Sequence, residues 1–119
     1  MQGGYCENCQ NQIDVLILRK GARRKQYTSV YSVSSIIAAI EVKSSYTYFS
    51  SARYDKLKAA LGDAPLLYLA YWHQKATADK VLDYFGKDAF VIEVAGKKQD
   101  WGKWDTLVQR IEKEIGRGK

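Results

Sequence analysis

Histidine, cysteine and proline are scarce in this chain, and long apolar runs are absent. Its single histidine, His73, excludes sites that need two or more imidazoles, such as two-histidine zinc centres and paired-histidine ribonuclease sites. The longest apolar run, Leu66 to Trp72, has seven residues, too few to cross a bilayer. The N-terminus has neither the basic nor the apolar segment of a signal peptide. We therefore expect a cytoplasmic protein without membrane contact, in which any catalysis uses carboxylates, lysine and metal.

The only two cysteines, Cys6 and Cys9, form one C-x-x-C motif. One such pair supplies half of a four-thiolate zinc site, so bound zinc would need two further thiolates from another chain. A thioredoxin-like redox role requires a strand before the motif, and residues 1–5 predict none. Three interpretations stay open: a short N-terminal lead-in over residues 1–12, a shared structural metal, or a disulfide tether between copies.

The remaining composition is that of one globular domain over residues 1–119, with 46% apolar and 27% charged residues and one proline. The formal net charge is +6, and the excess is uneven. Residues 1–60 carry nine basic and four acidic side chains, whereas residues 61–119 carry ten and nine. A basic excess on one part of a small domain favours polyanionic partners such as nucleic acid.

Apolar runs alternate with amphipathic stretches along the chain, which predicts an α/β fold. The strand candidates are apolar almost throughout, as expected for a mixed or parallel sheet covered by helices on both faces. We predict strands at Ile13–Leu18, Ile36–Lys43, Leu66–Trp72 and Phe90–Val94. We predict helices from Ser50 or Ser51 to Leu61, from a Thr77 cap to Gly86, and from Asp100 or Gly102 to Gly116.

A basic loop separates the first two predicted strands, with five basic residues in seven positions. It is either a solvated hairpin tip or a phosphate-binding segment beside the polar strand ends described next. Lys56 on the following helix extends this basic surface or is simply solvated. Ser44 and Ser45 either hydrogen-bond phosphate or lead into that helix. The bases of the loop are Arg19, Lys20, Arg23, Arg24 and Lys25.

Charged residues interrupt the first two apolar strands at positions where a lone charge would be costly. Asp14 lies near the start of the first strand, and Glu41 and Lys43 lie at the end of the second. Two neighbouring strands can bring these side chains together, and strand alternation puts Glu41 and Lys43 on one side. Carboxylate oxygens are the preferred ligands of Mg²⁺ or Mn²⁺, and Lys43 could orient the attacking water. The alternative is that these residues are merely solvent-facing strand ends.

The segments Asp14-Val-Leu-Ile-Leu18 and Ile37-Ala-Ala-Ile-Glu-Val-Lys-Ser-Ser45 resemble the signature of the PD-(D/E)XK nuclease superfamily. That superfamily includes many restriction endonucleases and the archaeal Holliday-junction resolvases, and the resemblance covers roughly residues 12–95. It implies a restriction endonuclease-like sheet of α-β-β-β-α-β order and hydrolysis of DNA phosphodiester bonds. It further implies that Asp14, Glu41 and the carbonyl of Val42 bind Mg²⁺, and that Lys43 assists the hydrolytic water.

The stretch before Asp14 departs from the resemblance, because family members usually begin with a helix that packs on the sheet. Gly3, Gly4 and the C-x-x-C motif leave no room for a full helix there, so we expect it to be reduced or missing. A homodimer could complete such a minimal domain. Two other functions stay open: a nucleic-acid-binding module of the same fold without activity, and a small interaction protein that dimerises through its N-terminal cysteines.

Overall fold

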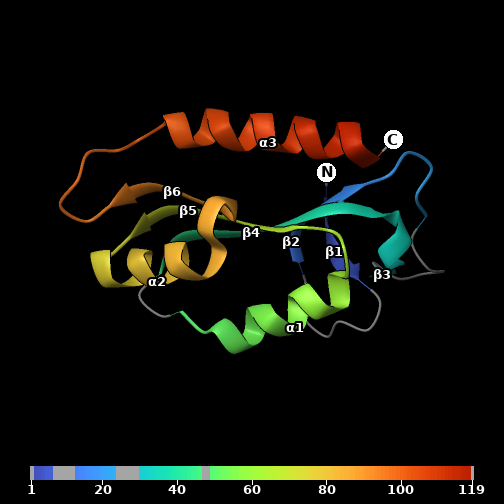
Figure 1. The fold of residues 1–119 in the computed structure, drawn as a ribbon, viewed down its shortest axis with the longest axis horizontal. Coiled ribbons are helices and arrows are strands. Elements are labelled where there is room, and N and C mark those ends of the chain that lie inside the picture. Colours follow the sequence, from blue (N-terminus) through green and yellow to red (C-terminus); the bar gives the residue numbers. More distant parts are fainter. Residues whose placement is uncertain (1, 7–12, 24–29, 47–48, 119) are drawn as a thin grey trace.

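The computed structural model describes residues 2–6, 13–23, 30–46 and 49–118, and these form one mixed sheet between two helical layers (Figure 1). The sheet has six strands in the order β3-β1-β2-β4-β5-β6. In chain order the strands are β1 (Gln2–Cys6), β2 (Ile13–Leu18), β3 (Val30–Tyr31), β4 (Ile36–Tyr46), β5 (Leu66–His73) and β6 (Ala89–Val94). The α-helices are α1 (Ser51–Leu61), α2 (Lys75–Phe85) and α3 (Gly102–Gly118), and short 3₁₀ turns precede β4 and β6.

Strand β2 runs antiparallel to both of its neighbours, β1 and β4, whereas β4, β5 and β6 are parallel to one another. The parallel strands are joined through α1 and α2, which lie on one face of the sheet, and α3 crosses the other face (Figure 1). The predicted α/β class, with a mixed sheet between helices, is therefore correct. None of the described helices has the length and apolarity needed to span a membrane.

Apolar side chains fill both faces of the sheet, which explains why its central strands lack a polar alternation. On the α1 and α2 side, Leu57 and Phe85 pack on strand residues such as Ala39 and Tyr68. On the α3 side, Leu107 packs on a cluster that includes Ile17, Ala38, Ile40, Leu67 and Phe90. Consecutive residues of β4 therefore contribute to the apolar cores on opposite faces of the sheet.

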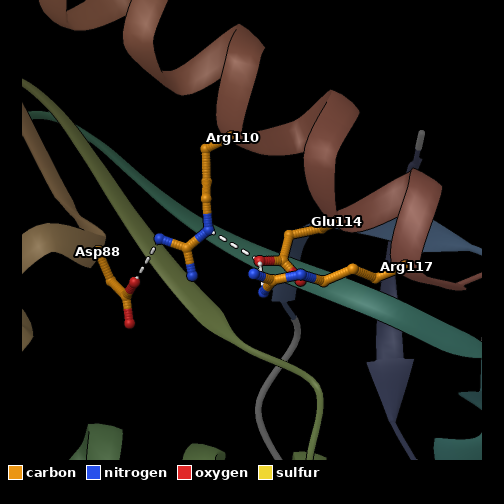
Figure 2. A network of polar contacts seen from close by, with 4 residues as sticks. All are labelled: Asp88, Arg110, Glu114 and Arg117. Atoms are coloured by element: carbon orange, nitrogen blue, oxygen red, sulfur yellow. Dashed lines mark hydrogen bonds and ion pairs between the residues drawn. The ribbon is translucent and has the colours of Figure 1, made fainter.

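A chain of ion pairs fixes the C-terminal half of α3 on the sheet (Figure 2). Arg110 lies between Asp88 at 2.7 Å and Glu114 at 2.9 Å, and Arg117 approaches the same Glu114 oxygen at 3.3 Å. The Glu114 side chain is 8% exposed. Burial of a carboxylate is tolerated here because two guanidinium groups pair with it.

The predicted elements agree with the structure where apolar runs define them, and differ at some ends. Strand β2 has the predicted bounds, and α1 ends before Gly62, whose φ of 64° suits glycine. Helix α2 begins at Lys75 after an extended Gln74, so Thr77 is not its cap but a buried residue within it. Helix α3 runs through Gly116, which is not among the glycines with positive φ.

Strand β1 was not expected, because two adjacent glycines give its residues little strand propensity. It forms because both of its edges find partners: β2 antiparallel on one side and β3 parallel on the other. Residues 2–6 are therefore part of the sheet and not a lead-in, and the argument against redox chemistry from a missing strand is wrong. Cys6 is 1% exposed within the core, an environment in which thiols are unreactive. Cys9 lies outside the described residues.

Candidate functional site

The antiparallel register of β2 and β4 determines where the site is built. Val15 pairs with Ile40, so the preceding Asp14 lies across from Glu41. The backbone N–H of Val42 donates a hydrogen bond of 2.9 Å to Oδ2 of Asp14. The structure thus brings together the two acidic residues selected from the sequence, and it ties Asp14 to the strand that carries Glu41.

Glu41 is fully buried, and its two carboxylate oxygens have different surroundings. Oε2 accepts a hydrogen bond from Nη2 of Arg53 at 3.2 Å and lies 3.9 Å from Nζ of Lys43. Oε1 has no hydrogen-bond partner among the described residues. Burial raises the pKa of the Glu41 carboxyl above its ordinary value of 4.5, the Arg53 guanidinium opposes this rise, and the nearby Asp14 carboxylate adds to it.

Arg53 is the residue of this site that the sequence analysis did not select. It lies in the first turn of α1, where the helix dipole disfavours a cation, and its Nε is buried without a partner among the described residues. The charge of Glu41 offsets that cost. No local pattern marks Arg53, because its contact depends on how α1 packs after β4.

The donor set of this site suits a hard divalent cation. The orphaned Oε1 of Glu41 is buried and negatively polarised, and the Asp14 carboxylate beside it is exposed. The carbonyl of Val42 points to the same side of β4 as its N–H, and therefore toward Asp14. Mg²⁺ is commonly held by one or two carboxylates with water and substrate oxygens in its other positions. No group of three or more His, Cys, Asp or Glu residues gathers into a metal cluster within the described ranges.

The chain matches no family model, no curated protein and no solved structure.

Arg19, the first base of the loop, lies at the end of β2 opposite Asp14, whereas the sequence analysis expected the loop beside the acids. Leu18 pairs with Ile36, and the N–H of Arg19 donates to the carbonyl of Ser35 at 2.8 Å. Arg19 follows Asp14 by five residues, so it lies about 17 Å away along the strand direction. Arg19 therefore lies at the strand ends opposite those that carry Asp14 and Glu41, so placing this base beside the acids was wrong.

The other selected residues are spread over the molecule. Lys20 and Arg23 are exposed near the start of the loop, Lys56 is exposed on α1, and Arg24 and Lys25 lie outside the described residues. Ser44 and Ser45 continue β4 as strand residues, so they do not lead into a helix. Among the selected residues whose side chains the structure describes, Asp14, Glu41, Val42 and Lys43 come together, with Arg53 added.

Proposed function

We propose that the protein is a metal-dependent nuclease that hydrolyses DNA phosphodiester bonds at the site formed by Asp14, Glu41 and Lys43. The observation that carries the proposal is the meeting of two carboxylates from adjacent strands beside a lysine. One buried oxygen of this pair is left without a hydrogen bond among the described residues. A structural ion pair would satisfy that oxygen, because an unmade hydrogen bond inside a protein costs about 1–3 kcal/mol.

The arrangement of the sheet supports the same proposal. The succession β1, β2, β4, α1, β5 reproduces the β-β-β-α-β portion of the order expected for a PD-(D/E)XK nuclease. The short β3 is an insertion at the outer edge, beside β1. In that order the family's first helix comes before the first strand, which corresponds to β1 here, so a further acidic ligand from such a helix is not part of the described site.

Each residue has a role that follows from its position. Asp14, Oε1 of Glu41 and the carbonyl of Val42 would hold Mg²⁺ or Mn²⁺. When bound, the metal would lower the pKa of the attacking water and stabilise charge on the phosphate. Lys43 is 18% exposed and would orient that water from its position near Glu41. Arg53 is a positioning residue, because it holds the Glu41 carboxylate through Oε2 and leaves Oε1 directed elsewhere.

A nucleic-acid-binding module without activity is the second candidate. One observation favours it: Arg53 and Lys43 already neutralise much of the charge of Glu41, which lowers its attraction for a cation. The third idea, a tether through the N-terminal cysteines, is weakened because Cys6 is buried in the core.

The test combines DNA cleavage with metal binding. Purified protein is incubated with supercoiled, linear, single-stranded and branched DNA in Mg²⁺, Mn²⁺ or EDTA, and Mn²⁺ binding is measured by calorimetry. We expect metal-dependent cleavage that Asp14→Asn and Lys43→Ala abolish, and Mn²⁺ binding that Asp14→Asn abolishes.

Matched control variants come from an exposed ion pair on α2, in which Lys75 lies 3.1 Å from Asp79. Asp79→Asn and Lys75→Ala make the same chemical changes away from the site and should leave cleavage intact. DNA binding without metal binding or cleavage would leave the inactive module as the function. Cleavage that survives Asp14→Asn would point to a contaminant or to another site.

A further inference from the structure

An apolar groove runs between α3 and the sheet, on the face opposite α1 and α2. Its volume is about 410 Å³, and its lining includes Val15, Val42 and Leu69 from the strands. Trp104, Val108 and Ile111 line it from the helix. A second cavity of about 270 Å³ shares Val42, Leu69 and Trp104, so the two form one continuous depression. Nothing among the described residues covers its mouth, where Val42 is 39% exposed.

The groove is open because the apolar arc of α3 is wider than the part that contacts the sheet. Leu107 and Glu114 face inward and are 2% and 7% exposed. Trp104 and Val108 belong to the same arc by helical spacing, yet they are 47% and 37% exposed. The ion pairs of Asp88, Arg110, Glu114 and Arg117 fix the rotation of the helix (Figure 2), so these side chains cannot turn onto the sheet.

Two further aromatic rings, those of Tyr71 and Trp101, line the second cavity at one end of the groove and remain half exposed. Trp101 is 53% exposed and Tyr71 is 45% exposed, with their ring centroids 6.1 Å apart. Gln99 connects them, since its Nε2 donates to the Tyr71 hydroxyl at 2.7 Å and its Oε1 accepts from the Trp101 indole at 3.2 Å. These rings are therefore held in place before anything binds, which lowers the entropic cost of burying them.

We propose that a second copy of this chain covers the groove, through a two-fold contact in which each copy places Trp101 into the groove of the other. A two-fold interface requires one surface to carry both the projection and the hollow that receives it. This face meets that requirement, because the projecting rings and the groove are adjacent. The groove is lined mostly by aliphatic side chains, which suit a protein side chain better than a charged nucleotide.

The exposed apolar area suits the core of such a contact, around which a polar rim would supply the rest. A Trp or Tyr side chain buries about 150–250 Å² when fully covered, so three half-exposed rings offer about 300 Å². Val42 and Val108 and the groove walls add to this. Apolar patches of about 300–600 Å² are the largest that monomers normally show, and they often mark interaction sites. A standard interface covers about 800 Å² per partner, with a polar rim around such a core.

The proposed contact adjoins the candidate nuclease site at Lys43, which also lines the second cavity, while the Glu41 carboxylate lies on the other face. Glu41 contacts Arg53 on the α1 side, whereas Val42, the next residue of β4, lines the groove on the α3 side. Dimerisation therefore does not depend on the proposed function, and it can be measured without DNA or metal.

The experiment measures the mass of the full chain by light scattering after gel filtration and by sedimentation equilibrium. We expect a dimer with a micromolar or tighter dissociation constant, and a blue shift of tryptophan emission as concentration rises. Val108→Asp should weaken dimerisation by at least about 100-fold, because it places a carboxylate from each copy in an apolar contact. Its circular dichroism and thermal midpoint at low protein concentration should match those of the wild-type monomer, since Val108 is already partly exposed in the single chain.

Leu82→Asp is the matched control, because Leu82 on α2 is 43% exposed on the other face of the sheet. That variant should dimerise like the wild type. A wild-type monomer at every concentration would overturn the proposal, as would a dimer unaffected by Val108→Asp or one lost equally in Leu82→Asp. A monomer whose tryptophan emission is quenched by single-stranded DNA, with quenching lost in Val108→Asp, would assign the groove to nucleic acid instead and also overturn it.

Discussion

Replacing Glu41 by glutamine should make the protein more stable at neutral pH, although it should abolish metal binding. The carboxylate is fully buried, one of its oxygens has no hydrogen-bond partner among the described residues, and its pKa is raised. The direction of this shift means that the folded protein favours the neutral form of the side chain more than the unfolded chain does, despite Arg53. Glutamine keeps the shape, accepts the hydrogen bond from Arg53 through its amide oxygen, and places its NH2 group in the position of Oε1, where the nearby Asp14 carboxylate offers an acceptor.

The expected gain is a balance of two quantities. An unsatisfied buried polar group costs about 1–3 kcal/mol, and exchanging a charged for a neutral partner weakens the Arg53 hydrogen bond by about 1 kcal/mol. The net stabilisation should be about 1 kcal/mol, which raises the melting temperature of a chain this size by about 4 °C.

The stability gained through Glu41→Gln should increase as pH rises. A carboxyl whose folded pKa exceeds its unfolded value contributes stability that is present below the unfolded pKa, and this is lost as pH rises through the folded pKa. The wild type should therefore lose stability relative to Glu41→Gln as pH rises above the ordinary value of 4.5, and the two should converge in acid. Mn²⁺ should reverse the order at neutral pH, because saturation at 100 Kd adds about 2.7 kcal/mol to the wild type alone.

The assay is urea unfolding of both proteins at several pH values, with and without Mn²⁺. Glu112→Gln, at an exposed position of α3, is the matched control and should change stability by less than about 0.5 kcal/mol. A Glu41→Gln protein that is less stable than the wild type by the same amount at every pH would refute the reasoning. Carboxylate burial would then not be a cost in this site.

Three further predictions concern the surroundings of the site and the basic loop. Arg53→Met should destabilise the protein by about 2 kcal/mol in urea unfolding, because it leaves the Glu41 carboxylate buried without its closest cation, and adding Glu41→Gln should recover most of that loss. Burial and the hydrogen bond to Asp55 raise the pKa of Tyr84 to about 12, so Asp55→Asn should lower it toward 10 in an ultraviolet titration; an unchanged titration would exclude Asp55 as a cause. Alanine at the loop bases Arg23, Arg24 and Lys25 should reduce the slope of log affinity for DNA against log salt by up to about 2.7 if each contacts one phosphate, and an unaltered slope would show that the loop makes no such contacts.

Apolar runs made the central strands predictable, because strands buried on both faces must be apolar throughout. Strands β2, β4, β5 and β6 belong to this class. Strand β1 does not, since its glycines carry no pattern and only its pairing with β2 and β3 makes it a strand. The cap of α2 was missed for a related reason: the helix begins two residues before the threonine that local preference favours.

The meeting of Asp14 and Glu41 was predictable because it needs only two adjacent antiparallel strands. The contribution of Arg53 was not, because it depends on the packing of α1 against β4. The position of Arg19 was also predictable from the topology. When a loop joins two antiparallel strands, it leaves from the strand ends opposite their free ends. Asp14 and Glu41 lie at the free ends of β2 and β4, so Arg19, which begins the loop, lies at the other end of these strands.

Strand β4 contributes residues to both proposed surfaces, the acidic site and the groove under α3, which lie on opposite faces of the sheet. Its odd residues Glu41 and Lys43 belong to the acidic site, and its even residues Ile40 and Val42 line the groove under α3, although Lys43 also lines the second cavity. Because the pleat directs them to opposite faces, a substitution on α3 such as Val108→Asp should leave Mn²⁺ affinity unchanged, and Asp14→Asn should leave the dimer intact. A dimer that loosened on adding Mn²⁺ would require the Val42 backbone to shift as its carbonyl binds the metal, since Val42 belongs both to the proposed metal site and to the groove.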